Sequence, residues 1–375
     1  FMLIPIAKPE NDYLAIPNLE KNFIKEFKSG IYVGGDNVRE FESNLSKFLK
    51  VKYVSSVNSG TDALYLSLKA LGLGKNDEVI IPSFTYVATL EAVLRVGSTP
   101  VFADIDENSF CISSKTVSDV VTDKTKCIIP VHLYGYNSDI ENIYKFASKN
   151  RIFIVEDSAQ SFGSKNLKGK YLGSIGNSGA FSNYPTKTLG GIGDGGFVST
   201  NNKDIYEKIN RLKDHGQNKK YTHLIPGYNS RMDSLNAYIL NQKLLNFKRI
   251  QNSRNNFIKF YNDFFSDFQK IKTIDFDGNQ TLLNYYSIIL PKKDRNKIND
   301  NLNLNDINSR IYYQKPLHLQ PLIRNYSNIN KDKINLPLTE IMSNSVLSLP
   351  LYSFPTKSEL KFIKDKLHLV FKGMK

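Results

Sequence analysis

Cysteines and long apolar runs are the features that this sequence most clearly lacks. Only two cysteines occur in 375 residues, Cys111 and Cys127, which are too few for a disulfide framework and lack the paired spacing of a zinc site. We expect both to be small buried hydrophobes in a reducing compartment. No stretch approaches the roughly 18 apolar residues that span a bilayer, and no basic-then-apolar signal layout opens the chain. These absences predict a cytoplasmic protein without a membrane partner.

Positive charge is in excess: the chain has 50 Lys and Arg residues and 36 Asp and Glu residues, which gives a formal net charge of +14. Such an excess attracts phosphates, and a DNA-binding regulator is one alternative that it suggests. The lysines are spread along the whole chain, and neither a helix-turn-helix block nor an aromatic and basic interleaving accompanies them. We therefore expect no nucleic-acid partner, while a positive field remains compatible with small anionic substrates.

Strands and helices alternate through the first half of the chain. Helical spacing of apolar residues predicts helices over residues 59–72, 85–96 and 139–149, and short apolar runs predict strands over residues 79–81, 100–104, 127–133 and 152–157. This alternation predicts an α/β fold with a large, mostly parallel sheet that helices cover on both faces. Ligands of such sheets bind beyond the carboxyl ends of the strands.

The pattern changes near residue 235, where a long amphipathic helix begins and runs toward Phe264. It is typical of a connection into a second unit, and a last helix is expected from Lys357. Because domains usually contain about 100 to 200 residues, we expect a large domain over residues 1–240 and a smaller C-terminal α/β domain over residues 241–375.

A lysine in a glycine-rich loop is the first candidate for chemistry. Lys187 follows Pro185 and precedes five glycines between residues 190 and 196, which carry no charge and permit tight packing. A lysine that is desolvated there loses proton affinity and becomes an amine nucleophile, as Schiff-base chemistry requires. A solvated surface lysine is the alternative interpretation.

An acid at the end of an apolar strand is the second candidate. Asp157 could be an ordinary helix N-cap. It could also pair with the ring nitrogen of pyridoxal 5'-phosphate (PLP), whose protonated ring acts as an electron sink. Gly60, Thr61 and Ser182 would then supply donors for the cofactor's phosphate at a helix start.

A competing motif lies in the same loop, because Gly191, Gly193 and Gly196 match the G-x-G-x-x-G of dinucleotide-binding folds. The motif requires a strand before it and a helix after it. Here the lysine loop precedes it, and residues 197–200 are strand-like. A nicotinamide-dependent oxidoreductase is therefore the weaker enzyme alternative.

Eight blocks in order resemble the DegT/DnrJ/EryC1/StrS family of sugar aminotransferases, which has the fold of the aspartate aminotransferase superfamily (fold type I). The blocks are SGIYVGGDNVREFE (29–42), NSGTDAL (58–64), DEVIIPSFTYVAT (77–89), PVFADID (100–106), VHLYG (131–135), VEDSAQSFG (155–163), FSNYPTKTLGGIGDGG (181–196) and GYNSRMDSLNAYIL (227–240). Together they cover nearly the whole chain.

The resemblance implies a role for each matching residue around PLP, with no metal. Lys187 would form the internal aldimine and shuttle protons, Asp157 would pair with the ring nitrogen, and Gln160 would lie beside the phenolic oxygen. Tyr86 would stack on the ring, with an ordinary core tyrosine as the alternative. A related branch has histidine in place of Lys187 and resembles dehydratases, so the lysine favours transamination.

The same resemblance implies a homodimer with shared active sites. Gly60, Thr61 and Ser182 would bind the phosphate, and Asn229 would reach the phosphate in the neighbouring subunit. Two residues, Asn183 and Ser230, stand where the family often has aromatics, which leaves substrate details open.

Substrate contacts are expected from a C-terminal segment, IYYQKPLHLQP (311–321), which is similar to that of members acting at C3 of deoxysugars. Candidates are Tyr312, Tyr313 and His318, together with Tyr184. The implied reaction moves an amino group from L-glutamate to C3 of a dTDP-3-keto-6-deoxyhexose, for an amino sugar of an antibiotic, a lipopolysaccharide O-antigen or another surface glycan. Amination at C4 of a nucleotide-linked 4-keto sugar is the alternative. His132 and His215 are expected to be structural.

Overall fold

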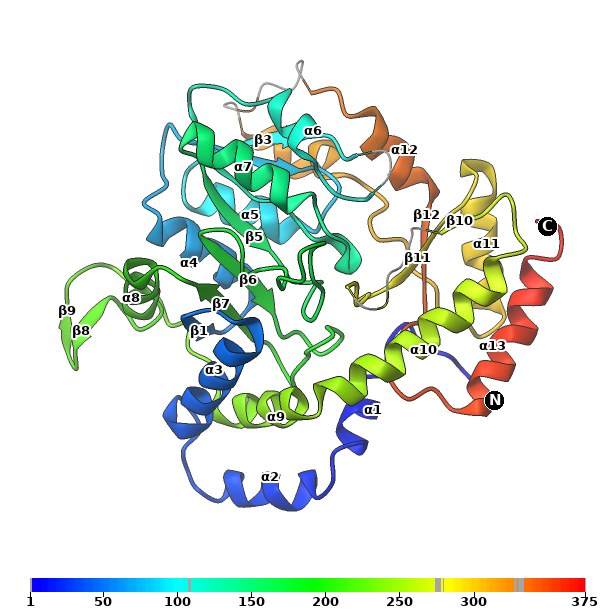
Figure 1. Cartoon of the computed structure of the whole chain (residues 1–375), viewed down its shortest axis with the longest axis horizontal. Coiled ribbons are helices and arrows are strands. Elements are labelled where there is room, and N and C mark those ends of the chain that lie inside the picture. Colours follow the sequence, from blue (N-terminus) through cyan, green and yellow to red (C-terminus); the bar gives the residue numbers. More distant parts are fainter. Residues whose placement is uncertain are drawn as a thin grey trace.

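A seven-stranded sheet forms the centre of the molecule (Figure 1), with the strand order β1-β7-β6-β5-β4-β2-β3. The computed structural model describes residues 2–106, 109–273, 278, 280–326, 329 and 334–374. Only β7 runs antiparallel to its neighbours, so the expected mostly parallel sheet is confirmed. The strands are β1 (Tyr53–Val57), β2 (Glu78–Pro82), β3 (Thr99–Ala103), β4 (Thr125–Ile128), β5 (Phe153–Asp157), β6 (Ser178–Ser182) and β7 (Gly196–Thr200).

Helices cover both faces of this sheet because successive side chains of a strand point to opposite sides. In β2, Val79 and Ile81 pack in one core cluster with α4 (Gly60–Ala70) and α5 (Val87–Arg95). Ile80 between them packs in another cluster, with α6 (Ser114–Ser118) and α7 (Ile140–Asn150). Further helices on the large sheet are α3 (Gly35–Leu49) and α8 (Lys203–Leu212), and an exposed hairpin of β8 (Gln217–Lys219) and β9 (Thr222–His223) extends beyond it.

The long helix predicted from residue 235 is two helices, α9 (Ser234–Leu245) and α10 (Phe247–Phe265), which differ in direction in Figure 1. The prediction of one continuous helix is wrong at Asn246, whose φ of −100° and ψ of 9° lie outside the helical range. Asparagine favours helix ends because its side chain competes for backbone hydrogen bonds. Two N-terminal helices, α1 (Pro9–Leu14) and α2 (Leu19–Phe27), precede α3, and α2 lies against α9.

A second, antiparallel sheet of β10 (Lys272–Thr273), β11 (Tyr286–Ile289) and β12 (Val346–Leu349) lies among C-terminal helices. These helices are α10, α11 (Lys292–Leu304), α12 (Pro337–Ser345) and α13 (Lys357–Val370). The start of α13 at Lys357 agrees with the last helix expected from the sequence. The beginning of the chain joins this part, since Ile4 pairs with Ile307 and the Leu351 N–H donates to the Ile6 carbonyl over 3.1 Å.

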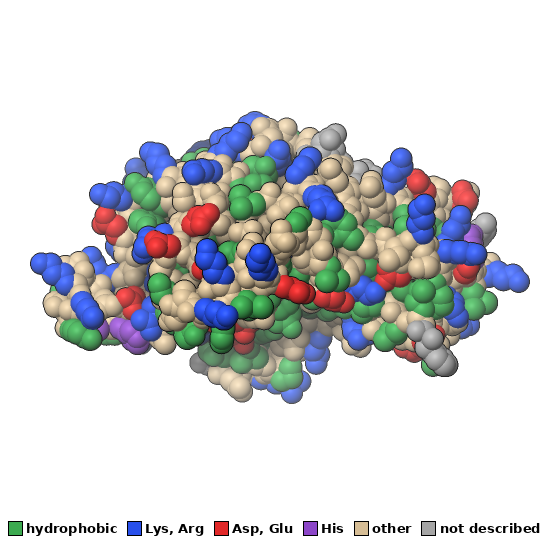
Figure 2. All heavy atoms as spheres, turned by 90° about the horizontal axis from the view of Figure 1, so that it is seen from below, with side chains coloured by type: hydrophobic (Ala, Val, Ile, Leu, Met, Phe, Trp, Pro, Cys, Tyr) green, Lys and Arg blue, Asp and Glu red, His purple; other side chains and the backbone are tan. Residues whose placement is uncertain are grey.

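Lysine and arginine side chains are spread across the face of the molecule shown in Figure 2 and do not gather in one patch. No helix within the described ranges has both the length and the apolar character to cross a bilayer. Both cysteines are buried and unpaired, as expected.

Candidate active site

A cavity of about 490 Å³ opens at the carboxyl edge of the large sheet. It is formed where β1, β5 and β6 end, because the carboxyl ends of parallel strands meet at one edge. Of the residues predicted to contact cofactor or substrate, all but Asn229 and His318 line it: Gly60, Thr61, Tyr86, Asp157, Gln160, Ser182, Tyr184, Lys187, Tyr312 and Tyr313.

Asp157 is the last residue of β5, and its carboxylate is buried at the cavity wall. The Thr89 hydroxyl donates to Oδ2 over 2.8 Å, and the Ala159 N–H donates to Oδ1 over 3.2 Å. Burial raises the pKa of Asp157, while these two donors and the positive charge of Lys187 act in the opposite direction. Such a carboxylate is stabilised by a cation placed beside it, which is what a protonated ring nitrogen supplies.

The start of α4 lies against Ser182 at another part of the cavity. Ser59 caps the helix by accepting the Asp62 N–H over 3.1 Å. A Cβ on Gly60 would lie only 2.7 Å from Cβ of Ser182, so a residue with a side chain does not fit there without a shift. This close approach places a hydroxyl beside the first N–H groups of a helix, which have no partner within the helix. The arrangement fits the phosphate of PLP.

The Lys187 loop folds tightly on itself. The Lys187 N–H donates to the Tyr184 carbonyl over 2.9 Å, and a Cβ on Gly190 would lie 2.2 Å from the Pro185 carbonyl oxygen. Lys187 is half-buried, whereas the glycine-rich loop predicted a desolvated lysine. The reason is that the side chain lines an open cavity and does not enter the apolar core.

Aromatic side chains from the C-terminal part of the chain, Tyr285, Tyr312 and Tyr313, also line the cavity. Gln160 accepts the Tyr134 N–H over 2.9 Å and donates to the Tyr313 hydroxyl over 3.0 Å, so its amide is held in one orientation. The rings of Tyr86 and Tyr313 have centroids 6.0 Å apart. Tyr312 packs on Tyr285 at a centroid distance of 4.7 Å.

Among the lining residues that were not candidates in the sequence, Thr89 and Tyr285 contact candidate residues directly. Thr89 could have been found, because it stands three residues after Tyr86, one helical turn away on α5, and so faces the same cavity. Tyr285 follows no pattern that distinguishes it from other core tyrosines, and only the approach of the C-terminal part brings it to the cavity.

Asn229 and His318 lie outside this cavity. Asn229 is exposed, and its Oδ1 accepts from Nε of Arg231 over 3.1 Å, so a contact with cofactor would have to be made in a second subunit. Nδ1 of His318 lies 2.7 Å from Oγ of Ser83, and Nε2 lies 3.3 Å from Oε1 of Glu340. With its side chain only 5% exposed, His318 holds its segment to the end of β2, and this geometry does not favour the substrate contact expected of it.

The geometry does not support a dinucleotide-binding motif in the glycine-rich loop or a catalytic role for His132. The glycines 191–196 lead directly into β7, so the helix that a dinucleotide fingerprint requires is not there. His132 is buried, with Nε2 2.9 Å from Oε2 of Glu156, as expected for a structural histidine. Among the described side chains, no group of three or more His, Cys, Asp or Glu could hold a metal ion.

Comparison with known proteins shows the family to which the whole chain is similar. The model of the DegT/DnrJ/EryC1/StrS aminotransferase family matches residues 17–368. The chain is 35% identical over 336 residues to UDP-2-acetamido-2-deoxy-3-oxo-D-glucuronate aminotransferase of Pseudomonas aeruginosa, covering 90% of this chain and 91% of that protein. It is 33% identical over 342 residues to dTDP-3-amino-3,6-dideoxy-alpha-D-galactopyranose transaminase of Aneurinibacillus thermoaerophilus, covering 91% and 92%.

Among solved structures, NtdA of Bacillus subtilis with bound cofactor PMP superposes with a TM-score of 0.84 at 31% identity, covering 97% of this chain and 82% of that one. The cofactor expected from the sequence, PLP with its amino form PMP, is thereby supported together with the fold. The chain belongs to the DegT/DnrJ/EryC1/StrS aminotransferase family and is a PLP-dependent aminotransferase of fold type I.

Proposed function

We propose that this enzyme transfers the amino group of L-glutamate to the keto carbon of a nucleotide-linked deoxysugar. The observation that carries the proposal is that Lys187 and Asp157 line one cavity with a phosphate cradle at the start of α4. Both named relatives act on, or are named for, nucleotide-linked sugars.

Four of the lining residues have roles at the cofactor in this proposal. The cofactor, when bound, supplies an electron sink for the carbon that loses or gains a proton. Lys187 would hold it covalently and carry the proton to and from that carbon. Asp157 would keep the ring nitrogen protonated, with Gln160 near the phenolic oxygen and Tyr86 on the ring face.

The sugar position proposed is C3 of a dTDP-3-keto-6-deoxyhexose. The segment 311–321 and the names of the two relatives, a 3-oxo sugar and a 3-amino sugar, support it. Tyr184, Tyr312 and Tyr313 line the cavity where the sugar would lie. The UDP-linked relative keeps the nucleotide open, and C4 amination of a 4-keto sugar is the second candidate. The product would serve a surface glycan or antibiotic pathway in the cytoplasm.

A homodimer is part of the proposal. Lys187 is the one cation among the described lining residues, yet L-glutamate and a diphosphate both carry negative charge. Further cations would come from a second subunit, whose Asn229 would also reach the phosphate. Within each subunit we propose residues 1–240 as the cofactor domain and residues 241–375 as the smaller domain.

The test offers the purified enzyme dTDP-linked 3-keto and 4-keto 6-deoxyhexoses, and UDP-linked counterparts, each with L-glutamate. We expect a 3-amino sugar and 2-oxoglutarate, identified by mass and NMR. Lys187→Ala is the control: it should lose the visible absorbance of the lysine-bound cofactor and all measurable turnover. A variant that transaminates at a comparable rate would remove Lys187 from its role.

A further inference from the structure

A buried polar cluster joins the N-terminal helix α1 to α9, and we call Asp12, Tyr13 and Lys243 the α1–α9 cluster. The side chain of Lys243 has no exposed surface, and its Nζ lies 2.8 Å from Oδ2 of Asp12. The same ammonium lies 4.9 Å from the centroid of the Tyr13 ring. The cluster is thus a buried ion pair with an aromatic ring over its cation.

The ammonium of Lys243 and the hydroxyl of Tyr13 both donate hydrogen bonds to backbone carbonyls of the Lys187 loop. Nζ of Lys243 donates to the carbonyl of Gly190 over 2.7 Å. The hydroxyl of Tyr13 donates to the carbonyl of Gly191 over 2.6 Å. These carbonyls stand three and four residues after Lys187 in the chain, so the cluster holds the part of the loop that follows the lysine.

Stability alone does not account for this cluster. Burial lowers the pKa of Lys243, and Asp12 acts against that effect. Apolar residues of similar volume usually stabilise a buried site at least as well as an ion pair does. What the apolar replacement would lack is a directed donor for the Gly190 carbonyl.

The rest of the loop is held in the same manner. The Asn183 amide donates to the Leu189 carbonyl over 2.8 Å, and the Asn236 side chain accepts the Ile192 N–H over 3.0 Å and donates to the Asp194 carbonyl over 2.9 Å. A Cβ on Gly191 would lie 2.1 Å from Oδ1 of Asn236, so the backbone passes close to these amides. Within residues 189–194, hydrogen bonds therefore come from α1, from α9 and from Asn183, the residue directly after β6.

We propose that Asp12, Tyr13 and Lys243 are positioning residues that set where Lys187 stands in the cavity. Reactive groups must be held to within fractions of an ångström, and side chains that support them carry that precision. Helix α1 would then affect the reaction rate through the position of Lys187, although α1 does not line the cavity. This inference rests on the proposed role of Lys187.

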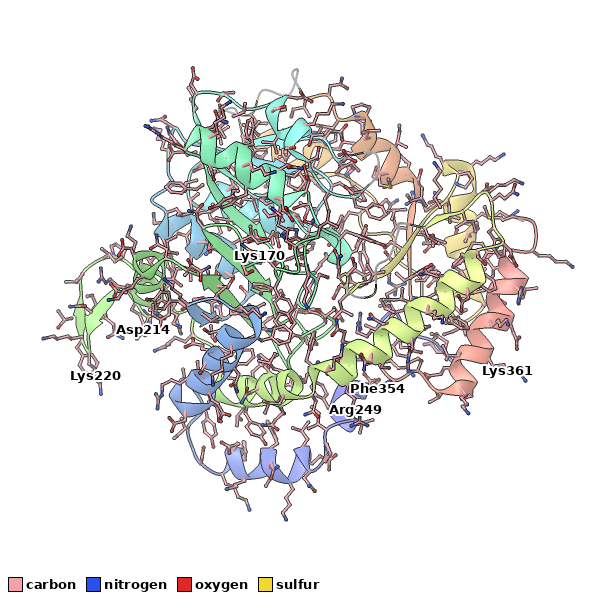
Figure 3. All side chains as sticks on the ribbon, in the orientation of Figure 1. Lys170, Asp214, Lys220, Arg249, Phe354 and Lys361 are labelled. Atoms are coloured by element: carbon pink, nitrogen blue, oxygen red, sulfur yellow. The ribbon has the colours of Figure 1, made fainter. Side chains whose placement is uncertain are left out.

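Two variants test it in the full-length, PLP-loaded enzyme. Tyr13→Phe removes only the hydroxyl that donates to Gly191, and Lys243→Met removes the ammonium while keeping the length of the side chain. Arg249→Met is the matched control. Arg249 lies on α10 beside the labelled Phe354 in Figure 3 and donates to the Ala15 carbonyl at the end of α1 over 2.9 Å, but it is exposed and has no hydrogen bond to the loop.

We expect kcat to fall by roughly 10- to 100-fold in Lys243→Met, and by less in Tyr13→Phe, with KM for the amino donor nearly unchanged. Amides of residues 188–194 should exchange hydrogen on the order of ten-fold faster in both variants and at the normal rate in Arg249→Met. Borohydride reduction and peptide mapping identify the lysine bonded to the cofactor, which tests the proposed function separately.

Normal exchange of these amides in Tyr13→Phe would overturn the inference, and this variant decides if Lys243→Met does not fold. Faster exchange in Arg249→Met to the same extent would also overturn it, because the effect would then come from a loosened α1. A change in kcat without a change in exchange would point to another cause and count against the proposal.

Discussion

At the scale of single residues, the hydrogen bond from the Thr89 hydroxyl helps to set the pKa of Asp157. Burial raises the pKa of this carboxyl, and the Thr89 hydrogen bond is the largest of the effects that oppose it. Hydrogen bonds to charged groups stabilise by about 1.5–3 kcal/mol. Thr89 therefore helps to keep Asp157 charged where a protonated ring nitrogen needs it.

Thr89→Val should raise the pKa of Asp157 further, because the shape is kept and the donor is lost. We expect the acid limb of the pH–rate profile to move to higher pH and kcat at pH 7 to fall by roughly 10-fold or more. Thr89→Ser keeps the hydroxyl and should stay close to the wild type. An unchanged pH profile in the valine variant would show that the bond has no such role.

Asp157→Asn should separate stability from activity. The folded pKa of Asp157 lies above its ordinary value of 3.8, so the folded cofactor-free protein binds this proton more tightly than the unfolded chain does. The stability that this group contributes is then present below pH 3.8 and is lost as pH rises through the folded pKa. At pH 7 the cofactor-free Asp157→Asn protein should have a higher Tm than the wild type, while the loaded enzyme loses several orders of magnitude in rate. A lower Tm at pH 7 would contradict the expectation.

At the scale of elements, the contact between the start of α4 and the end of β6 decides whether a phosphate can bind. The helix offers N–H groups and the strand offers Ser182, and they meet because Gly60 has no side chain. The cradle thus depends on two elements that lie more than 100 residues apart in the sequence.

Gly60→Ala should separate these elements, because its Cβ would lie 2.7 Å from Cβ of Ser182. We expect PLP affinity, measured by titration of the cofactor-free protein, to fall by roughly 10- to 100-fold, with a stability loss of about 1–3 kcal/mol. Gly74→Ala is the control, since its Cβ would have its nearest contact at 3.9 Å. Equal PLP affinity in both variants would argue against the cradle.

Elements also show where local patterns predict structure well. Helices α4, α5 and α7 and strands β2, β3 and β5 lie within a few residues of their predicted ranges, because hydrophobic periodicity and end signals are local. The break at Asn246 was not predicted, since apolar spacing continues across it and a single asparagine is tolerated in many helices.

At the scale of the whole molecule, the proposed dimer predicts that two different inactive or weakened variants complement each other when they assemble. Asn229 is exposed and lies outside its own cavity, so it would act on the neighbour's cofactor. Lys187→Ala should be inactive, and Asn229→Ala should bind PLP about 10-fold more weakly. In a mixed dimer of the two variants, one of the two sites takes Lys187 from one chain and Asn229 from the other. That site should bind PLP with the wild-type affinity and be active.

Activity and cofactor affinity of the refolded mixture measure this complementation. Tandem purification through two different tags isolates the mixed species. If the mixture behaves as the average of its parents, Asn229 does not act across an interface.

The sequence by itself determined the parallel sheet, the Lys187 loop and the strand-end carboxylate, because these follow from periodicity, glycine spacing and motifs that lie within a few residues. Only the tertiary structure decided that Tyr285 faces the cavity, that His318 is held by Ser83 and Glu340, and that α1 reaches the Lys187 loop through Tyr13. The physical reason is that each of these contacts joins segments far apart in the chain. Packing of the whole molecule places such segments, and no local preference of either one predicts the meeting.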